Sequence, residues 1–223
     1  KESGADVGFV VDPDVDRLAI VQDGGEMFGE EYTLVAIADY VLAHTPGSTV
    51  SNLSSSRALR DVTEAHGCTY TAAAVGEVNV TTEMKRTGAV IGGEGNGGVI
   101  YPELHYGRDA LVGVALFLTL MAKTGRKPSE IRAMMPEYCI YKTKVQLQPG
   151  LNVDKLLVQI KEKYADEKIT DIDGVKIDFA DSWVHLRKSN TEPIVRVYSE
   201  AQTPEKAEAL ANSVKDVILA MID

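Results

Sequence analysis

The sequence contains few of the residues that build disulfide frameworks or zinc sites. Its 223 residues include two cysteines, Cys68 and Cys139, with no Cys-x-x-Cys pair and no histidine-rich tract. Disulfide-stapled secreted domains and zinc modules carry several closely spaced cysteines or histidines. Their absence argues against those classes and favours a protein of the reducing cytoplasm.

Long apolar runs and an excess of positive charge are also missing. The longest apolar stretch, residues 110–122, has 13 residues, whereas a membrane-spanning helix needs about 20. The formal net charge of −10 disfavours non-specific nucleic-acid binding, although a local basic pocket could still bind a small anion. We therefore expect neither a membrane nor a nucleic acid as a partner. The chain starts at Lys1 without a signal-peptide pattern, so we expect a piece of a longer polypeptide.

The first part of the sequence alternates short β-branched segments with amphipathic ones. We predict strands over 7–11, 18–21, 49–53, 69–75 and 89–91. We predict helices over 30–43, 56–66, 78–86 and 110–122, with Gly67 and Gly88 at C-terminal caps and Asp109 at an N-terminal cap. This alternation is typical of an α/β domain with a mainly parallel sheet covered by helices.

The pattern changes after a linker at 123–128 and a short helix at 129–135. Strands are predicted over 141–147, 183–187 and 194–199, with a hairpin turn at Asp173–Gly174. Helices are predicted over 153–165 and from Thr203-Pro204-Glu205 onward, where proline occupies the first helical position. The sequence therefore predicts a separate small α+β domain at the C-terminal end.

The turn Asp12-Pro-Asp-Val-Asp-Arg17 carries three carboxylates at alternate positions between two predicted strands. Asp12, Asp14 and Asp16 can converge on one hard cation, and Mg²⁺ prefers such oxygen ligands. Arg17 beside them could neutralise a phosphate held on the metal. A solvated acidic turn and a calcium-binding module are the alternatives. An EF-hand does not fit, because its sixth position would be Arg17 where glycine is needed, and strands flank the loop.

A second loop, residues 92–98, is rich in glycine. Gly93, Gly95 and Gly98 match G-x-G-x-x-G, which keeps a nicotinamide-dependent oxidoreductase open as an alternative. That fingerprint should open a helix, but a β-branched segment ending in proline follows here. Glu94 and Asn96 among these glycines better suit hydrogen bonding to sugar hydroxyls.

A third loop joins two predicted strands near the C-terminal end. It combines two cations with hydroxyl and amide groups, namely Arg187, Ser189, Asn190, Thr191 and Arg196. Arginine donates two parallel hydrogen bonds to phosphate, and the exposed backbone amides can add others. The sequence therefore predicts a phosphate-binding loop, with an ordinary polar hairpin as the alternative.

In their order and separation, the three loops resemble those of the α-D-phosphohexomutase family, which includes phosphoglucomutase, phosphomannomutase and phosphoglucosamine mutase. Members of this family have four domains. The resemblance implies that residues 1–25 are the C-terminal hairpin of the second domain with the metal loop. It implies that 26–125 are the sugar-recognition third domain and 138–223 the phosphate-binding fourth. The family's phosphoserine loop belongs to the first domain, and these residues contain no candidate for it.

The resemblance also implies a mechanism and roles for the residues. A phosphoserine held on Mg²⁺ gives its phosphate to a sugar hydroxyl, and the bisphosphorylated sugar turns and returns its other phosphate. Asp12, Asp14 and Asp16 would hold the metal, and Arg17 the transferring phosphate. Glu94 and Asn96 would orient the sugar, while the loop from Arg187 to Arg196 would hold the other phosphate.

Some positions differ from the family pattern. Asn96 stands where members usually have serine, Ser54 where many have lysine, and Glu77 where many have histidine. The Gly-Glu-x-Asn-Gly-Gly loop and the run 106–109 resemble a phosphoglucosamine/phosphomannomutase branch. Glucosamine phosphate is therefore the favoured substrate, with mannose and glucose phosphates as alternatives. Alone, the chain is expected to be inactive, its partners being a sugar phosphate and the N-terminal domains of its own polypeptide.

Overall fold

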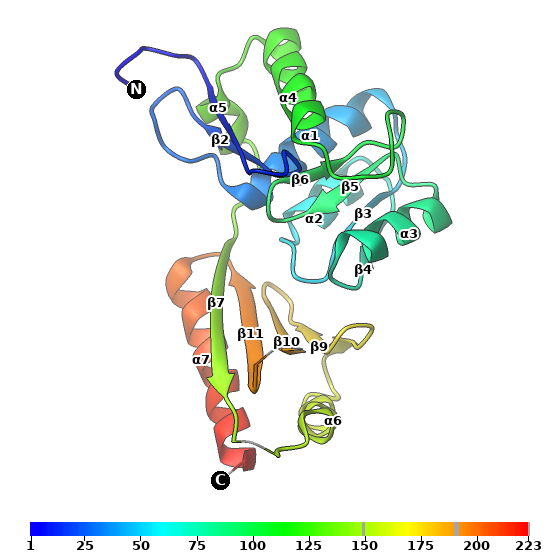
Figure 1. Ribbon diagram of the computed structural model, residues 1–223, viewed down its shortest axis with the longest axis vertical. Coiled ribbons are helices and arrows are strands. Elements are labelled where there is room, and N and C mark those ends of the chain that lie inside the picture. Colours follow the sequence, from blue (N-terminus) through cyan, green and yellow to red (C-terminus); the bar gives the residue numbers. More distant parts are fainter. Residues whose placement is uncertain (149, 190–191, 223) are drawn as a thin grey trace. The chain divides into compact units, whose positions relative to one another are not determined.

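The computed structural model describes residues 1–148, 150–189 and 192–222, and the chain forms two compact units, Lys1–Pro136 and Glu137–Asp223 (Figure 1). The first unit contains strands and helices that alternate as the sequence predicts. They are β1 (Gly8–Val11), β2 (Leu18–Val21), α1 (Glu30–His44), β3 (Thr49–Asn52), α2 (Ala58–Ala65), β4 (Tyr70–Ala73), α3 (Glu77–Thr87), β5 (Ile91–Glu94), β6 (Gly98–Ile100), α4 (Ala110–Thr124) and α5 (Pro128–Ala133).

The sheet of the first unit is mainly parallel, as predicted. Its order is β4-β3-β5-β6, with β3 parallel to both of its neighbours and β6 antiparallel to β5 at the edge. β1 and β2 form a separate antiparallel hairpin around the acidic turn. After β3 the chain adds β4 on one side of it and then β5 on the other side. The carboxyl ends of β3 and β5 therefore flank a topological switch point, which is where α/β folds bind ligands.

One strand boundary was predicted wrongly. The strand expected at 89–91 begins at Ile91 and runs to Glu94, through Gly92 and Gly93. A Cβ on Gly92 would lie 2.6 Å from the Val50 carbonyl oxygen and 2.6 Å from Met84 Sδ. The glycines therefore serve close packing inside the sheet, a role that their usual association with loops conceals.

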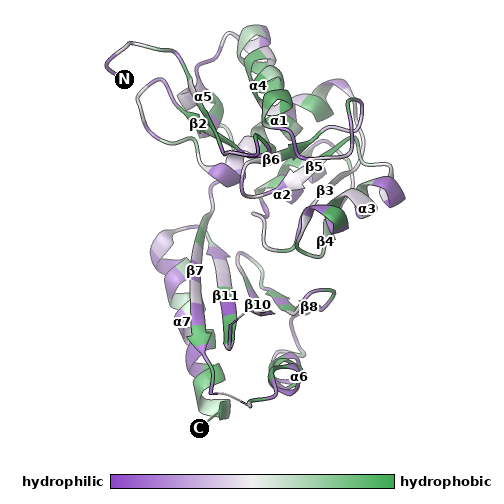
Figure 2. Cartoon of the chain, in the orientation of Figure 1, coloured by the Kyte–Doolittle hydropathy of each residue, from purple (hydrophilic) through white to green (hydrophobic). Residues whose placement is uncertain are grey.

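Helices α1 and α4 supply much of the apolar core of the first unit. Figure 2 shows α4 as a largely apolar helix. Phe117 on α4 meets Phe28 edge-to-face, with ring centroids 5.2 Å apart. The Asp109 side chain caps α4 by accepting from the amides of Leu111 and Val112, and Gly88 ends α3 in the left-handed conformation, both as predicted. None of the helices in the described part of the chain has the length and apolarity to cross a membrane.

The second unit is an antiparallel sheet with two helices. Its elements are β7 (Cys139–Gln146), α6 (Val153–Lys163), β8 (Lys168–Thr170), β9 (Val175–Asp178), β10 (Trp183–Lys188), β11 (Ile194–Ala201) and α7 (Pro204–Ile222). The sheet order is β7-β11-β10-β9-β8. The sequence did not predict β8 and β9, which flank the expected turn at Gly174. They are short, and Lys168 in β8 and Lys176 and Asp178 in β9 interrupt their apolar pattern.

His185 on β10 is a buried titratable group in the second unit. Its side chain is 1% exposed, and Nε2 donates to the Asp173 carbonyl at 2.7 Å. Burial lowers the pKa of His185 to about 4, and the cations Lys176 and Arg187 act in the same direction. The folded unit therefore keeps this imidazole neutral at pH values where the unfolded chain protonates it.

The stability of the second unit should fall with acidity. The pKa of His185 is lower in the folded unit than in the unfolded chain. The contribution of the neutral imidazole to stability is therefore fully present above about pH 6.5 and is lost as the pH falls towards about 4. The loss in the free energy of unfolding should be about 3 kcal/mol. Urea unfolding at several pH values should show this slope, and His185→Gln should flatten it. The exposed His44 gives the control His44→Gln, which should leave the slope unchanged. Equal slopes in wild type and His185→Gln would contradict the assignment.

Candidate functional site

The acidic turn between β1 and β2 is held by its own backbone. Asp12 Oδ1 accepts from the Asp16 amide at 3.1 Å and the Arg17 amide at 3.2 Å. Val15 adopts a φ of 57°, which is uncommon for a β-branched residue. Its carbonyl accepts from the Ala110 amide at 3.1 Å, which attaches the turn to the start of α4.

The carboxylates of the turn meet near Arg17. Arg17 Nε lies 3.9 Å from Asp12 Oδ2 and 3.8 Å from Asp16 Oδ1, so both oxygens face one point. Burial raises the pKa of Asp12, but hydrogen bonds from the Arg17 and Asp16 amides outweigh it, and the pKa is below its usual value. Asp16 Oδ1 is buried and has no hydrogen-bond partner among the described residues. A buried carboxylate oxygen that has no hydrogen bond, beside a second carboxylate, suits a cation.

The third aspartate of the turn, Asp14, forms no ion pair with Arg17 in the described part of the chain, unlike Asp12 and Asp16. Asp14 is exposed, and within the described residues no three His, Cys, Asp or Glu side chains are gathered as metal ligands are. Mg²⁺ is often held by one or two carboxylates, with water or substrate phosphate completing its shell. Asp12 and Asp16 fit that arrangement, and metal binding by all three aspartates stays a prediction.

Glu94 ends β5 at the switch point of the sheet, and its side chain is buried. Its Oε1 accepts from Asn52 Nδ2 at 2.8 Å and from the Gly76 amide at 3.3 Å. Asn52 ends β3, so this hydrogen bond crosses between the two parallel strands. Asn96 lies two residues further, and its Oδ1 accepts from the Gly98 amide at 3.1 Å. The two residues predicted to bind sugar therefore occupy the position where the fold places ligands.

The glycine-rich segment is a hairpin that other elements approach closely. A Cβ on Gly95 would lie 1.8 Å from the Glu31 carboxylate, and one on Gly97 would lie 2.3 Å from the Leu18 carbonyl. Gly97 also has a φ of +86°. Strand β6 follows where a dinucleotide fingerprint would open a helix, so the nicotinamide alternative loses its structural basis.

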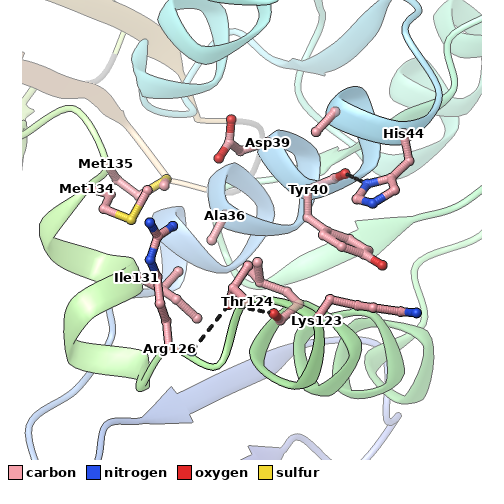
Figure 3. A pocket seen from close by; sticks show the side chains of 12 residues that line it. Ala36, Asp39, Tyr40, His44, Lys123, Thr124, Arg126, Ile131, Met134 and Met135 are labelled. Carbon is pink, nitrogen blue, oxygen red and sulfur yellow. Dashed lines mark hydrogen bonds between the residues drawn. The ribbon is translucent and has the colours of Figure 1, made fainter.

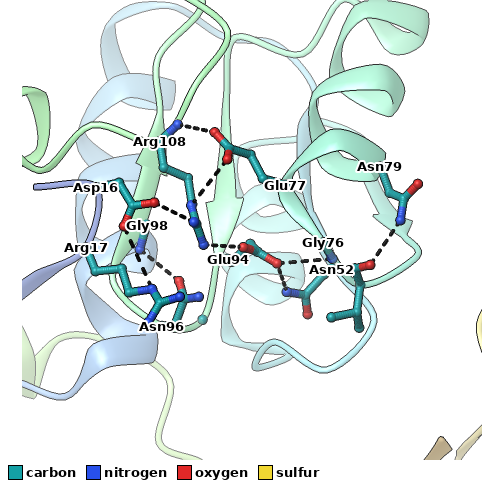
Figure 4. Close-up of polar contacts among 12 residues, drawn as sticks. Asp16, Arg17, Asn52, Gly76, Glu77, Asn79, Glu94, Asn96, Gly98 and Arg108 are labelled. Carbon is teal, nitrogen blue, oxygen red and sulfur yellow. Dashed lines mark hydrogen bonds and ion pairs between the residues drawn. The ribbon is translucent and has the colours of Figure 1, made fainter. Parts of the chain in front are cut away.

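Arg108 joins the acidic turn to the sugar loop, as Figure 4 shows. Nη1 donates to Glu94 Oε2 at 2.7 Å, and Nη2 donates to Asp16 Oδ2. The Arg108 amide donates to Glu77 Oε1 at 2.8 Å. Arg108 was not among the predicted site residues. The sequence offered two signals, its place in the run 106–109 and its place beside the capping residue of α4, and neither shows which carboxylates it meets.

Two of the predicted phosphate-binding residues, Arg187 and Arg196, lie on the sheet of the second unit. Arg187 on β10 pairs in register with Arg196 on β11, which pairs with Lys144 on β7, so the three cations share one face. Arg187 Nε lies 3.0 Å from Asp173 Oδ2. Lys144 and Arg196 line an open hollow of about 300 Å³. Lys144 was not predicted, because its strand reads as an ordinary alternating pattern.

The rest of this loop is partly described. The Ser189 amide donates to the Ile194 carbonyl at 3.1 Å, and Ser189 Oγ accepts from the Glu192 amide at 3.3 Å. Asn190 and Thr191 lie outside the described residues. Their phosphate role stays a prediction.

A further hollow of about 250 Å³ lies among α1, α4 and α5 of the first unit (Figure 3). Its lining mixes apolar residues with Asp39, Tyr40, His44 and Lys123. None of the residues predicted to bind metal or sugar lines it. The acidic turn and the sugar loop, which Arg108 connects, therefore form the candidate site of this unit.

Comparison with known proteins finds family models that match both units. The model of the phosphoglucomutase/phosphomannomutase alpha/beta/alpha domain III matches residues 29–138, and that of the C-terminal domain matches 144–217. A Thermococcus kodakarensis phosphoglucomutase/phosphomannomutase is 35% identical over 93% of this chain and 46% of its own length. A Sulfurisphaera tokodaii phosphoglucosamine/phosphogalactosamine mutase is 32% identical over 96% of this chain and 48% of its own length.

A solved structure shows the same fold. It is a phosphoglucomutase/phosphomannomutase family protein from Burkholderia thailandensis, with a TM-score of 0.82 at 25% identity over 97% of this chain and 47% of that one. The chain spans about half the length of the curated relatives that it matches. Because the two family models together match most of its residues, the chain belongs to the phosphoglucomutase/phosphomannomutase family of α-D-phosphohexomutases.

Proposed function

We propose that the chain supplies the metal, sugar and phosphate loops of an enzyme that interconverts the 1-phosphate and 6-phosphate of a hexosamine. The observation that supports this proposal most is the contact of Arg108 with both Asp16 and Glu94, because it joins the turn proposed to hold the metal to the loop proposed to bind the sugar. Glucosamine phosphate is the favoured substrate, since relatives such as that of Methanococcus maripaludis are named phosphoglucosamine mutase. Mannose and glucose phosphates are the alternatives.

Glu94 has the capacity to accept one more hydrogen bond from a sugar. A carboxylate offers about four acceptor positions. Asn52, the Gly76 amide and Arg108 occupy three of them. A sugar hydroxyl would take the fourth, and the Nδ2 group of Asn96 could donate to a neighbouring oxygen. Glu94 and Asn96 would bind sugar hydroxyls and not a phosphate. They therefore suit a sugar that binds in either of two orientations, as the 1-phosphate or as the 6-phosphate.

The charged residues would position the phosphates. Asp12 and Asp16, with Asp14 from the same turn, would hold Mg²⁺, which neutralises charge on a transferring phosphate. Arg17 is half exposed and reaches both carboxylates only at long range, so its guanidinium can bind that phosphate. Arg187 and Arg196, with Lys144, would hold the phosphate that does not react. This chemistry requires little beyond positioning and charge neutralisation.

The phosphate is carried by a serine in the family, and that serine belongs to a domain outside the two matched here. We infer that these 223 residues bind a sugar phosphate without converting it. A 1-phosphate and a 6-phosphate should both bind, because the sugar loop recognises hydroxyls. The partners of the site are then the sugar phosphate and the remaining domains of the same polypeptide.

Replacing Asn96 by alanine should weaken binding of glucosamine 6-phosphate about fivefold, the expected loss for one neutral hydrogen bond. The affinity can be measured by NMR titration of the 223-residue chain with Mg²⁺ present. Asn79→Ala is the matched control, because Asn79 on α3 also bonds a nearby backbone group, the Val75 carbonyl. Unchanged affinity in Asn96→Ala, or conversion of the 6-phosphate to the 1-phosphate by the chain alone, would contradict the proposal.

Replacing Arg187 by alanine should abolish phosphate-dependent shifts in the second unit. Arg187→Lys should restore them only in part, because an ammonium group cannot donate two parallel hydrogen bonds. The measurement compares NMR shifts produced by glucosamine 6-phosphate with those produced by glucosamine. Arg86→Lys, on an exposed face of α3, is the control and should change nothing. Equal shifts from both ligands in the wild type would remove the phosphate role from this loop.

A further inference from the structure

Arg108 is the one residue in the described contacts that bonds both the acidic turn and the sugar loop. Its guanidinium meets the carboxylates of Asp16 and Glu94, and Nε lies 3.7 Å from Glu77 Oε2. The Arg108 side chain is 13% exposed, which strengthens each contact relative to one in water. The arrangement is therefore a single, largely buried cation shared by three carboxylates that are exposed to different degrees.

The backbone fixes the place of this side chain. Arg108 forms an isolated bridge with Ile100 after β6, and the next residue, Asp109, caps α4. A Cβ on Gly98 would lie 2.4 Å from Arg108 Cδ, so the arginine stem lies directly on this glycine. A side chain at position 98 would occupy the space of the Arg108 stem, so the reach of the guanidinium to Asp16 depends on Gly98.

The charges around Arg108 do not balance. Asp16, Glu77 and Glu94 surround one guanidinium. A second cation, Arg17, is 51% exposed, and its Nε lies 3.8 Å from Asp16 Oδ1. One oxygen of Asp16 bonds Arg108, while the other is buried without a hydrogen bond. A divalent cation at the turn would use the free oxygen and draw electron density from the one that Arg108 holds.

We propose that Arg108 is a positioning residue that holds Glu94 in place for the sugar and competes with a divalent cation for the Asp16 carboxylate. This inference rests on the proposed function, since it concerns the same metal and sugar loops. Cation binding weakens the Arg108–Asp16 contact and frees Nη2 to donate to an anionic ligand. By linkage, the cation and the anionic ligand then strengthen each other's binding.

Titration of the 223-residue chain with Mg²⁺, followed by calorimetry, tests the competition. Arg108→Met removes the charge and keeps much of the stem, and should bind Mg²⁺ about tenfold more tightly. Arg108→Lys keeps the charge but cannot hold Asp16 and Glu94 together, and should bind about threefold more tightly. Arg86→Met, which breaks an exposed pair with Glu83, is the control and should leave the affinity unchanged.

A second readout needs no metal. The Gly76 amide and Asn52 Nδ2 both donate to Glu94, so their NMR signals report the position of that carboxylate. Both Arg108 variants should move these signals in metal-free protein, and Arg86→Met should not. The Arg108→Lys variant keeps a cation beside the three carboxylates. It should therefore fold even if Arg108→Met does not, and the test does not depend on the Met variant.

The outcomes separate the inference from the function on which it rests. Equal Mg²⁺ affinity in wild type and Arg108→Lys, or unmoved Gly76 and Asn52 signals, would overturn the role of Arg108 while leaving the metal loop intact. Absence of Mg²⁺ binding in wild type and both variants would overturn the competition together with the proposed metal loop. Tighter Mg²⁺ binding in the order Met, Lys, wild type, with moved signals, supports the proposal.

Discussion

The contact of one guanidinium with carboxylates from two distant segments organises the site of the first unit. Asp16 and Arg108 are 92 residues apart in the sequence, and Glu94 comes from a third element. A buried charge is tolerated only when it is paired and hydrogen-bonded, so each of these groups depends on the others. The sheet supplies the framework, since β5 ends at Glu94 and the segment carrying Arg108 pairs with β6.

The acidic turn contains two features that lower the stability of the fold, a strained backbone and a buried oxygen without a hydrogen bond. Val15 holds a left-handed backbone conformation that costs a β-branched residue on the order of 1–2 kcal/mol. Hydrogen bonds within the turn, and the one from Ala110 to the Val15 carbonyl, offset this strain. Asp16 also keeps a buried oxygen without a hydrogen bond. Strain and an unsatisfied polar atom in one short turn are typical of a site that completes itself with a ligand.

Most of the fold could be predicted from the sequence, because local signals and global architecture agree. Hydrophobic periodicity, glycine and aspartate caps and the proline at position 204 together predicted the helices seen in the described residues, and the caps at Gly88 and Asp109 followed from their residue types. Prediction failed for elements whose structure depends on contacts with residues far away in the sequence. The glycines of β5 look like loop residues in the sequence, and only the contact of Gly92 with the Val50 carbonyl shows why a strand needs them. Strands β8 and β9 are too short and too polar to be recognised from their sequence pattern.

The same limit applied to the site. Motifs showed Asp12, Asp16, Glu94 and Arg187, because their residue types and spacing are unusual on their own. Arg108 and Lys144 became visible only through their neighbours, one through an isolated bridge beside β6 and the other through strand register with Arg196. The neighbours of these two residues come from distant parts of the chain, so no local pattern marks them. Sequence reasoning therefore finds residues with an unusual local pattern more readily than residues whose surroundings are set by the tertiary fold.

A double-mutant cycle between Arg108 and Glu94 tests the central claim most directly. Urea unfolding of the first unit, followed by its own amide signals, would be measured for Arg108→Met, Glu94→Gln and the double variant. If the two side chains form one buried unit, the losses should be non-additive by about 1 kcal/mol or more. Additive losses would mean that Arg108 and Glu94 stabilise the protein independently, and would contradict the account.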